Sequence, residues 1–345
     1  MSSHIDIDGT IGGGSVIRLA IPLALALNKS IRVTKIRQVK ERRTGLQIQH
    51  LTGLNFLAQL TGSQLMGNTI GSPELYLTPG NLTTPTDFLP KIKVESAAAI
   101  SLIVQILSNY VFASRKPIMF EFEGGGTHIR HSPNFDILLH VNKPLFELFG
   151  VRLHIQLTRP GYYPVGGALG RIFLEPITPP QQKVILTTGP VKSIEVFSYA
   201  SADLKSKLVA EKQLSGFKSI LNPTKEYTGY ANASSSGYSC SAVVKYEANS
   251  IKGIAEIGGQ SDSPEDIGRK TAELTKKTID NVATVDEQLA DQLILPLAFA
   301  PSGSEYTFDN MYEHVNTNIT VIKQILGENV IKVQKEGTLY RLTKI

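Results

Sequence analysis

The sequence has little of what marks secreted or membrane proteins, beginning with its single cysteine, Cys240. An intramolecular disulfide is therefore impossible, and a reducing compartment is the expected environment. The first ten residues, MSSHIDIDGT, lack the basic stretch and apolar core of a secretory signal. The most apolar run, residues 97–113, is too short for a membrane span and contains Gln105 and Asn109. We interpret this run as a buried core helix and expect no membrane association.

The composition is that of a globular protein, with 41% hydrophobic and 19% charged residues. A chain of 345 residues is long enough to form more than one structural unit. The net charge of +5 is compatible with a polyanionic partner, although a solvated lysine-rich face explains it equally well.

Strand-like and helix-like segments alternate along the chain, which predicts an α/β or α+β fold. The pattern of strand, helix, strand, helix and strands occurs twice in succession, so we expect a repeated module of the βαβαββ type. The predicted strands span residues 5–8, 31–36, 74–77, 117–122 and 152–158, and the predicted helices span residues 17–27, 51–60, a segment around 102, and 144–149.

The composition of the sequence changes near Pro179, where the glycine-rich signatures end. The following segments predict strands at 191–199, 238–246 and 253–257 and a helix at 202–214. A further helix is marked by Ser263 as N-cap, Pro264 at its first position and Asp266 as a capping-box acid. We therefore predict a small inserted α/β domain at residues 184–276 and a large repeated-module domain formed by residues 1–183 and 277–345.

Three glycine-rich loops could present backbone N–H groups to a phosphate: 12–14, 124–126 and 166–167. For any one loop a tight turn is the favoured interpretation, and none fits a Walker or Rossmann fingerprint. A basic run is either a phosphate-contacting loop or an exposed charged one; it contains Lys35, Arg37, Lys40, Arg42 and Arg43. No group of His, Cys and acidic residues has metal-ligand spacing, which argues against a structural zinc site.

His314 stands in the segment YEHVNTNI, just before an apolar-periodic run. Taken alone, a lone histidine is more often structural than catalytic.

Several segments, read together and in this order, resemble the RNA 3'-terminal phosphate cyclase family. The matching segments cover nearly the whole chain; they are DGTIGGGSVIRLA (8–20), GLQIQHLTG (45–53), GSPELYLTPG (71–80), GGGTHIRHSPNFD (124–136), RPGYYPVGGALG (159–170), VDEQLADQLILPLAFA (285–300) and EHVNTNI (313–319).

The resemblance implies an ATP-dependent reaction through a covalent histidine–AMP intermediate. A neutral imidazole attacks the α-phosphorus of ATP, and AMP then passes to an RNA 3'-phosphate, which the neighbouring 2'-OH closes into a 2',3'-cyclic phosphate. The implied partners are ATP, Mg²⁺ or another divalent cation whose ligands are not assigned, and RNA with a 3'-terminal phosphate. In a eukaryotic cell the implied location is the nucleus, and otherwise it is the cytoplasm.

The resemblance also assigns roles to individual residues. His314 matches the nucleophile, and Arg18 matches an active-site arginine suited to a phosphate. Asp291 would orient the His314 ring or assist the metal, although it could also be a helix-surface acid. The remaining matches lie around the nucleotide: Gln49, Gln105, Arg37, Pro133 and Gln292.

Three departures from the family pattern put the full catalytic rate in doubt, and the first of them, in the first glycine loop, favours an alternative without catalysis. The first glycine loop lacks the usual Glu and has Ser15 in place of a Gln, Ala168 replaces a glycine, and Ser132 replaces a proline. The alternative is a cyclase-like RNA-binding or scaffold protein of ribosomal RNA processing, although that branch lacks the histidine that His314 provides. A carboxyvinyl transferase shares the repeated-module architecture, but it would not require the HVNTNI segment.

Overall fold

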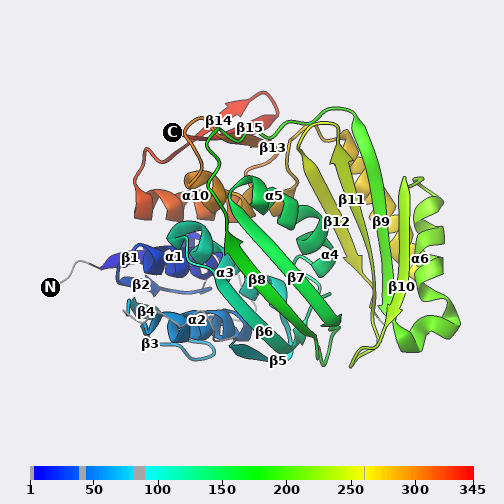
Figure 1. The fold of residues 1–345 in the computed structure, drawn as a ribbon, viewed down its shortest axis with the longest axis horizontal. Helices are drawn as coiled ribbons and strands as arrows, with labels where there is room; N and C mark the ends of the chain where they lie inside the picture. The colour runs from blue at the N-terminus through cyan, green and yellow to red at the C-terminus, as the bar shows by residue number, and fades with distance from the viewer. Residues whose placement is uncertain (1–3, 39–43, 81–89, 260) are drawn as a thin grey trace.

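The computed structural model describes residues 4–38, 44–80, 90–259 and 261–345. Within these residues the chain forms a mixed α/β structure with four sheets (Figure 1). Three of the sheets each belong to one copy of a repeated module. The fourth sheet, at the right of Figure 1, belongs to an insert. The predicted fold class is confirmed.

The first module is a βαβαββ unit whose four strands are ordered β1-β2-β4-β3. Strands β1 and β2 are parallel and the other pairs are antiparallel. Its elements are β1 (Ile5–Asp8), α1 (Gly14–Ala26), β2 (Ile31–Thr34), α2 (Ile48–Thr61), β3 (Gln64–Met66) and β4 (Leu75–Thr78), with a 3₁₀ turn at Gly9–Ile11.

The second module repeats this topology, with its strands ordered β5-β6-β8-β7 and only the first pair parallel. Its second helix is interrupted by a π-helical segment, Leu138–Asn142. Its elements are β5 (Lys91–Ala99), α3 (Ile100–Ser114), β6 (Ile118–Gly126), α4 (Phe135–Ile137), α5 (Lys143–Leu148), β7 (Val151–Arg159) and β8 (Leu169–Pro176).

A third module has the same order, although its first strand is reduced to a short segment. The N–H of Glu305 in β13 donates to the Val184 carbonyl at 2.8 Å, and the Leu186 N–H donates to the Glu305 carbonyl at 3.0 Å. Residues 184–186 thus lie parallel to β13, and the sheet continues as β13-β15-β14. Its elements are α8 (Glu287–Gln292), α9 (Ile294–Ala298), β13 (Glu305–Phe308), α10 (Glu313–Leu326), β14 (Ile331–Glu336) and β15 (Leu339–Lys344).

The insert follows that first short strand and carries a sheet ordered β10-β9-β11-β12, with α6 and α7 on one face (Figure 1). A separate small core lies between them and includes Val196, Phe217 and Cys240. Its elements are β9 (Val191–Ser201), a 3₁₀ turn (Ala202–Lys207), α6 (Val209–Lys218), β10 (Lys225–Ala231), β11 (Tyr238–Tyr246), β12 (Ile251–Ile257) and α7 (Pro264–Asp280). The predicted limits of the large and inserted domains stay a prediction.

The three modules share one continuous hydrophobic core. Helix α1 is buried from Gly14 to Leu25 and packs against α3 and α10. A helix that is apolar on every side belongs in a protein interior, which is why the sequence places this one at the centre. Helix α1 of the first module is thereby held between the second and third modules.

The predicted elements are largely confirmed, with two exceptions in the insert. The helix predicted at 202–214 is a 3₁₀ turn followed by α6, because Leu208 adopts a left-handed φ of +53° that ends the first segment. Strand β10 was not predicted; it is a largely exposed edge strand, so it lacks the apolar alternation that marks a half-buried one. The cap of α7 is confirmed, since Ser263 accepts a hydrogen bond from the Asp266 N–H and Pro264 is its first residue.

Candidate active site

His314 is the second residue of α10, and its imidazole faces the start of α1. Its Nδ1 lies 3.2 Å from the Oγ of Ser15, and the side chain is exposed to solvent. One turn later, the Thr317 hydroxyl donates to the Ile11 carbonyl at 2.8 Å and fixes the first glycine loop against α10. A side chain at Gly12 would collide with Thr317, because a Cβ there would lie 2.3 Å from its Oγ1. The first glycine loop therefore brings the starts of two helices together.

The N-termini of α1 and α10 both lack a side-chain cap. Gly13 and Tyr312 stand at the two N-cap positions and make no side-chain capping bond. The first amides of a helix have no intrahelical partner and carry a partial positive charge, so they favour an anion. Helix α1 also has no acidic residue in its first turn. The point where the helices meet is suited to a phosphate.

Arg18 lies one turn into α1 and is only 9% exposed. Its Nε donates to the Oε1 of Gln105 in α3 at 2.7 Å. Because this bond occupies one edge of the guanidinium, the direction of the side chain is fixed. Arg18 and Gln105, both predicted site residues, are brought into direct contact from modules one and two.

His50 joins this cluster from α2, one residue after the predicted Gln49. Its ring is 1% exposed, and its Nδ1 accepts the N–H of Gln47 at 3.3 Å. Burial first, and then the positive charges of Arg18 and Arg37, hold the pKa of His50 well below its usual value. The structure thus places the predicted Arg37 close enough to act on this site; Lys40, Arg42 and Arg43 lie outside the described residues.

No role was predicted for His50, although the resemblance included it in the QHL segment. Its Nε2 has no hydrogen-bond partner among the described residues. The available sequence signal was its spacing, three residues after Gln47, which matches the reciprocal bonds of a capping box.

Asp291 lies in α8 on another side of Arg18. Burial raises the pKa of its carboxyl to about 7, and the positive charge of Arg18 acts in the opposite direction. Its backbone carbonyl accepts the amide of Asn318 at 3.2 Å, which ties α8 to α10. The carboxyl is therefore part of the Arg18 environment and not a freely hydrated helix-surface acid.

Two predicted residues, Gln292 and Pro133, are neighbours of residues that line a cavity beside the insert. Gln292 accepts a bond from the Asn142 amide at 2.7 Å and donates to the Gln288 carbonyl at 2.8 Å. Pro133 follows Ser132, and both Ser132 and Gln288 line a cavity of about 540 Å³ between the modules and the insert. A second cavity of about 470 Å³ shares Gln288 and extends to Tyr312, directly before α10.

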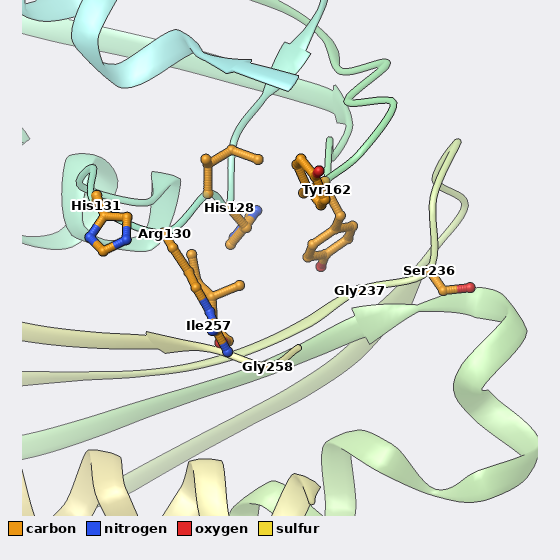
Figure 2. Close-up of a pocket in the computed structure, with 10 residues that line it drawn as sticks. His128, Arg130, His131, Tyr162, Ser236, Gly237, Ile257 and Gly258 are labelled. Atoms are coloured by element: carbon orange, nitrogen blue, oxygen red, sulfur yellow. The ribbon is translucent and has the colours of Figure 1, made fainter. Parts of the chain in front are cut away.

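A third cavity of about 300 Å³ adjoins the first through Arg130 (Figure 2). Figure 2 shows Tyr162 and His128 on one side and Ser236 on the other, so the walls come from the second module and the insert. Arg130 crosses this boundary and donates to the Ile257 carbonyl at 3.1 Å. This cavity is a separate pocket beside the boundary and includes none of the predicted catalytic residues.

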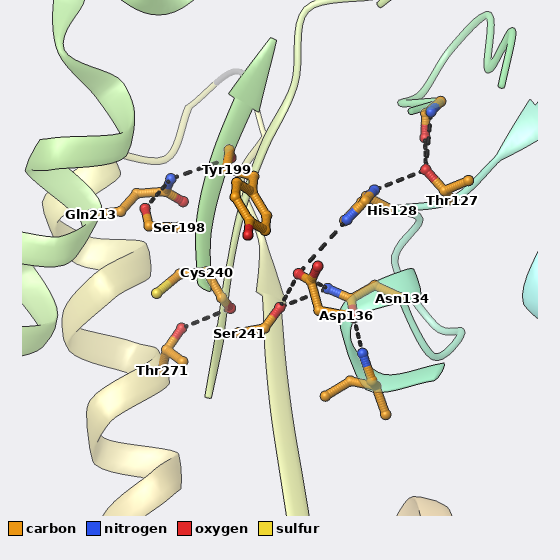
Figure 3. Close-up of polar contacts among 12 residues, drawn as sticks. Thr127, His128, Asn134, Asp136, Ser198, Tyr199, Gln213, Cys240, Ser241 and Thr271 are labelled. Carbon is orange, nitrogen blue, oxygen red and sulfur yellow. Dashed lines mark hydrogen bonds and ion pairs between the residues drawn. The ribbon is translucent and has the colours of Figure 1, made fainter. Parts of the chain in front are cut away.

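Polar side chains below this cavity join the second module to the insert (Figure 3). Ser241 of β11 donates to the Asp136 carboxylate at 2.8 Å and accepts the Asn134 amide at 2.8 Å. His128 Nε2 lies 3.7 Å from the same carboxylate, while its Nδ1 lies 2.8 Å from the Thr127 hydroxyl. All five side chains are buried, so this cluster is a structural joint.

The second and third glycine loops pack against each other and do not precede a long helix. The Gly124 N–H donates to the Ala168 carbonyl at 2.8 Å, and the Ala168 N–H donates to the Gly125 carbonyl at 3.2 Å. Gly124 has a φ of +90°, which an L side chain rarely adopts. Glycines 124–126 form the end of strand β6, whereas Gly166 closes a tight turn by donating its N–H to the Tyr162 carbonyl at 2.7 Å. Only the first loop leads into the site.

The described residues contain no group of three His, Cys, Asp or Glu side chains placed to hold a metal ion. The predicted Mg²⁺ therefore has no ready protein ligand set in this part of the chain. Across the same described residues, every helix is too short or too polar to cross a bilayer.

The fold and site define a class: a repeated βαβαββ protein in which two helix N-termini, an arginine and a histidine lie close together. A family model described as RNA 3'-terminal phosphate cyclase matches residues 10–331. The chain belongs to the RNA 3'-terminal phosphate cyclase family, a family of ligases, and the predicted resemblance is confirmed.

Similar proteins extend over nearly the same length. One named RNA 3'-terminal phosphate cyclase, from Ectopseudomonas mendocina (strain ymp), is 30% identical over 98% of this chain and 97% of its own. Another with that name, from Koribacter versatilis (strain Ellin345), is 31% identical over 93% of this chain and 90% of its own. A protein named probable RNA 3'-terminal phosphate cyclase, from Dictyostelium discoideum, is 28% identical over 93% of this chain and 76% of its own.

Proposed function

We propose that this protein uses ATP to convert the 3'-terminal phosphate of an RNA into a 2',3'-cyclic phosphate through a covalent His314–AMP intermediate. The observation that carries the proposal is the solvent-exposed His314 ring, held beside Ser15 where two uncapped helix N-termini meet. A nucleophile at that point would face phosphates gathered by backbone amides and Arg18.

The first step forms a bond between a ring nitrogen of His314 and the α-phosphorus of ATP. If Nδ1–H donates to the Ser15 hydroxyl, the lone pair of the neutral ring is at Nε2, which is then the attacking atom. The bond from the α-phosphorus to the bridging oxygen breaks, and pyrophosphate leaves. Ser15, which replaces a glutamine of the family pattern, thereby fixes the tautomer and direction of the ring.

The two following steps return the histidine to its free form. An oxygen of the RNA 3'-phosphate attacks the phosphorus of the His314–AMP adduct and releases Nε2, which gives an RNA–adenylate. The vicinal 2'-OH then attacks the RNA phosphorus, loses its proton and expels AMP. Both steps bring anions together, so they depend on fixed positive groups more than on further covalent chemistry.

Positive groups and amides around His314 supply that stabilisation. Arg18 is directed by Gln105 and suits a phosphate oxygen, and Arg37 adds a second positive charge nearby. The adenine would lie along the boundary with the insert, near Pro133 and Gln292, and Gln49 would line the site from α2. We expect Mg²⁺ to enter bound to the phosphates of ATP, since Mg²⁺ usually binds substrate phosphates and water.

Incubation with Mg²⁺ and ATP labelled at the α-phosphate tests the proposal. We expect an acid-labile protein–AMP adduct, no retained label from ATP labelled at the γ-phosphate, and cyclic ends on RNA that carries a 3'-phosphate. His314→Ala should lower adduct formation by more than about 10³-fold, because the nucleophile is lost. His154→Ala removes an exposed histidine paired with Glu175 and should leave the adduct unchanged.

A wild-type protein that forms no adduct but still binds RNA would replace this proposal with the scaffold alternative. Retention of the adduct in His314→Ala would instead place the nucleophile elsewhere. The cellular compartment, nuclear in a eukaryote and otherwise cytoplasmic, stays a prediction that imaging of the tagged full chain would check.

A further inference from the structure

The inference concerns His50, a buried histidine whose Nε2 has no hydrogen-bond partner in the described part of the chain. Its Nδ1 accepts the backbone N–H of Gln47 at 3.3 Å, which a protonated nitrogen could not do. The pKa of His50 is held well below its usual value, so the ring is neutral. A neutral imidazole carries one proton, which must therefore be on Nε2. His50 is thus a hydrogen-bond donor at Nε2 and not a metal ligand there.

That donor has no acceptor among the described residues. The ring is 1% exposed, so Nε2 is shielded from bulk water. Buried donors are nearly always paired, and an exception calls for an explanation in function. The missing hydrogen bond of His50 Nε2 indicates that a bound ligand supplies the acceptor.

The surroundings of Nε2 identify the kind of acceptor. A Cβ placed on Gly14 would lie 2.5 Å from His50 Nε2 and 2.8 Å from Arg18 Nη1, so both nitrogens approach the first residue of α1. This helix has thirteen residues, an uncapped N-terminus and no acid in its first turn. Three sources of hydrogen-bond donors or positive charge are close together here: the first amides and Arg18 of α1, His50 of α2, and Arg37. Together they suit an anion with several acceptor oxygens.

We propose that His50 Nε2 donates a hydrogen bond to a phosphate oxygen bound at the N-terminus of α1, beside Arg18. The proposal rests on the proposed function, in which phosphates of ATP and of the RNA end both enter this site. His50 is then a binding residue that uses a neutral ring, since the two nearby arginines oppose an additional positive charge.

Two substitutions of similar size separate binding from packing. His50→Asn keeps an acceptor near the position of Nδ1 for the Gln47 N–H but has no group at the position of Nε2. His50→Gln can place its amide N–H near Nε2. With pyrophosphate as the probe, we expect binding in the wild type and in His50→Gln. Binding should be about 10-fold to 100-fold weaker in His50→Asn, as measured by calorimetry at equal ionic strength.

A spectroscopic measurement on the wild type observes the bond directly. In protein labelled with ¹⁵N-histidine, the His50 ring should be neutral and protonated at Nε2, and its proton signal should move downfield when pyrophosphate is added. A His50 signal that does not respond to saturating pyrophosphate would overturn the proposal.

Two activity measurements identify the source of the phosphate. A defect of His50→Asn confined to adduct formation from ATP assigns the oxygen to ATP. A defect confined to transfer of AMP from the isolated adduct to RNA 3'-phosphate assigns it to the RNA. If His50→Asn binds pyrophosphate and performs both steps like the wild type, the proposal is overturned. It is also overturned if His50→Asn and His50→Gln lose binding to the same extent and have equally lowered melting temperatures. Failure of the wild type to form the His314 adduct would instead contradict the proposed function.

Discussion

At the scale of single residues, the environment of each polar atom decides what it can do. His314 is exposed and in contact with Ser15, whereas His50 is buried and its pKa is lowered. Asp291 is a carboxyl whose burial raises its pKa to about 7, so it holds a proton over part of the physiological range. Residue type alone would give both histidines the same pKa and Asp291 an ordinary low one.

The raised pKa of Asp291 predicts a pH-dependent stability. In the unfolded chain this carboxyl loses its proton near pH 4, whereas in the folded chain it does so near pH 7. The folded state therefore binds more protons between these values, so its stability falls as the pH rises from about 4 to about 7 and levels off above that. Asp291→Asn cannot ionise, so its free energy of unfolding should not show this fall. The difference in unfolding free energy, variant minus wild type, should therefore increase by about 1–2 kcal/mol from pH 5 to pH 8, a range that allows for solvent screening of a partly exposed group.

Urea denaturation of both proteins at the two pH values measures this difference. Glu273→Gln, which changes an exposed acid of α7, serves as the control and should follow the wild type. Parallel pH profiles for wild type and Asp291→Asn would contradict the raised pKa.

At the scale of elements, α1 shows how a helix tolerates an internal proline. Pro22 has no N–H, so the carbonyl of Arg18, four residues earlier, loses its usual partner. The side-chain amide of Asn109 in α3 donates to this carbonyl at 2.9 Å. Asn109 therefore stabilises the turn of α1 that carries Arg18, and it joins the first two modules.

This arrangement predicts a coupling between Asn109 and Pro22. Asn109→Ala should lower the unfolding free energy by about 1–3 kcal/mol, because the buried Arg18 carbonyl is left without a donor. The loss should be smaller in a Pro22→Ala background, where the new N–H can bond to Arg18 within the helix. A double-mutant cycle by urea denaturation measures the coupling, and strictly additive losses would exclude it.

At the scale of the whole molecule, the insert is joined to the second module by buried polar side chains. Asn134 is central to this joint: it caps α4 through the Ile137 N–H at 3.0 Å and donates to Ser241 at 2.8 Å (Figure 3). Because Ser241 lies in β11 of the insert, one side chain stabilises both a helix start and the boundary beside the cavities.

Asn134→Ala should therefore loosen the insert more than it unfolds the modules. We expect faster hydrogen exchange in β11 and β12 and an overall loss of about 2–3 kcal/mol, since buried acceptors and donors lose their partners. Asn232→Ala, at an exposed loop position of the insert, is the control and should leave exchange unchanged. An equal rise of exchange throughout the chain would show that Asn134 supports global stability only.

Much of the fold could be predicted because its elements are marked locally. The apolar stretch of α1, the alternation of β11 and the Ser263 cap of α7 each depend on residues close in sequence. Strand β10 and the break at Leu208 could not be predicted, since an exposed edge strand and a left-handed residue leave little hydrophobic pattern. The third copy of the module could not be recognised from the sequence pattern either, because the insert separates its first strand, at 184–186, from β13.

The sequence by itself determined the α/β class and the family, because these follow from local patterns and from motifs in order. The residues of the phosphate site stay a prediction. Only the tertiary structure decided which atoms meet: Ser15 and His314 are 299 positions apart, yet their side chains are in contact. It also decided that glycines 124–126 end a strand, and that the buried Nε2 of His50 has no hydrogen-bond partner among the described residues. Such facts depend on which surfaces pack together and exclude water, and no local pattern encodes them.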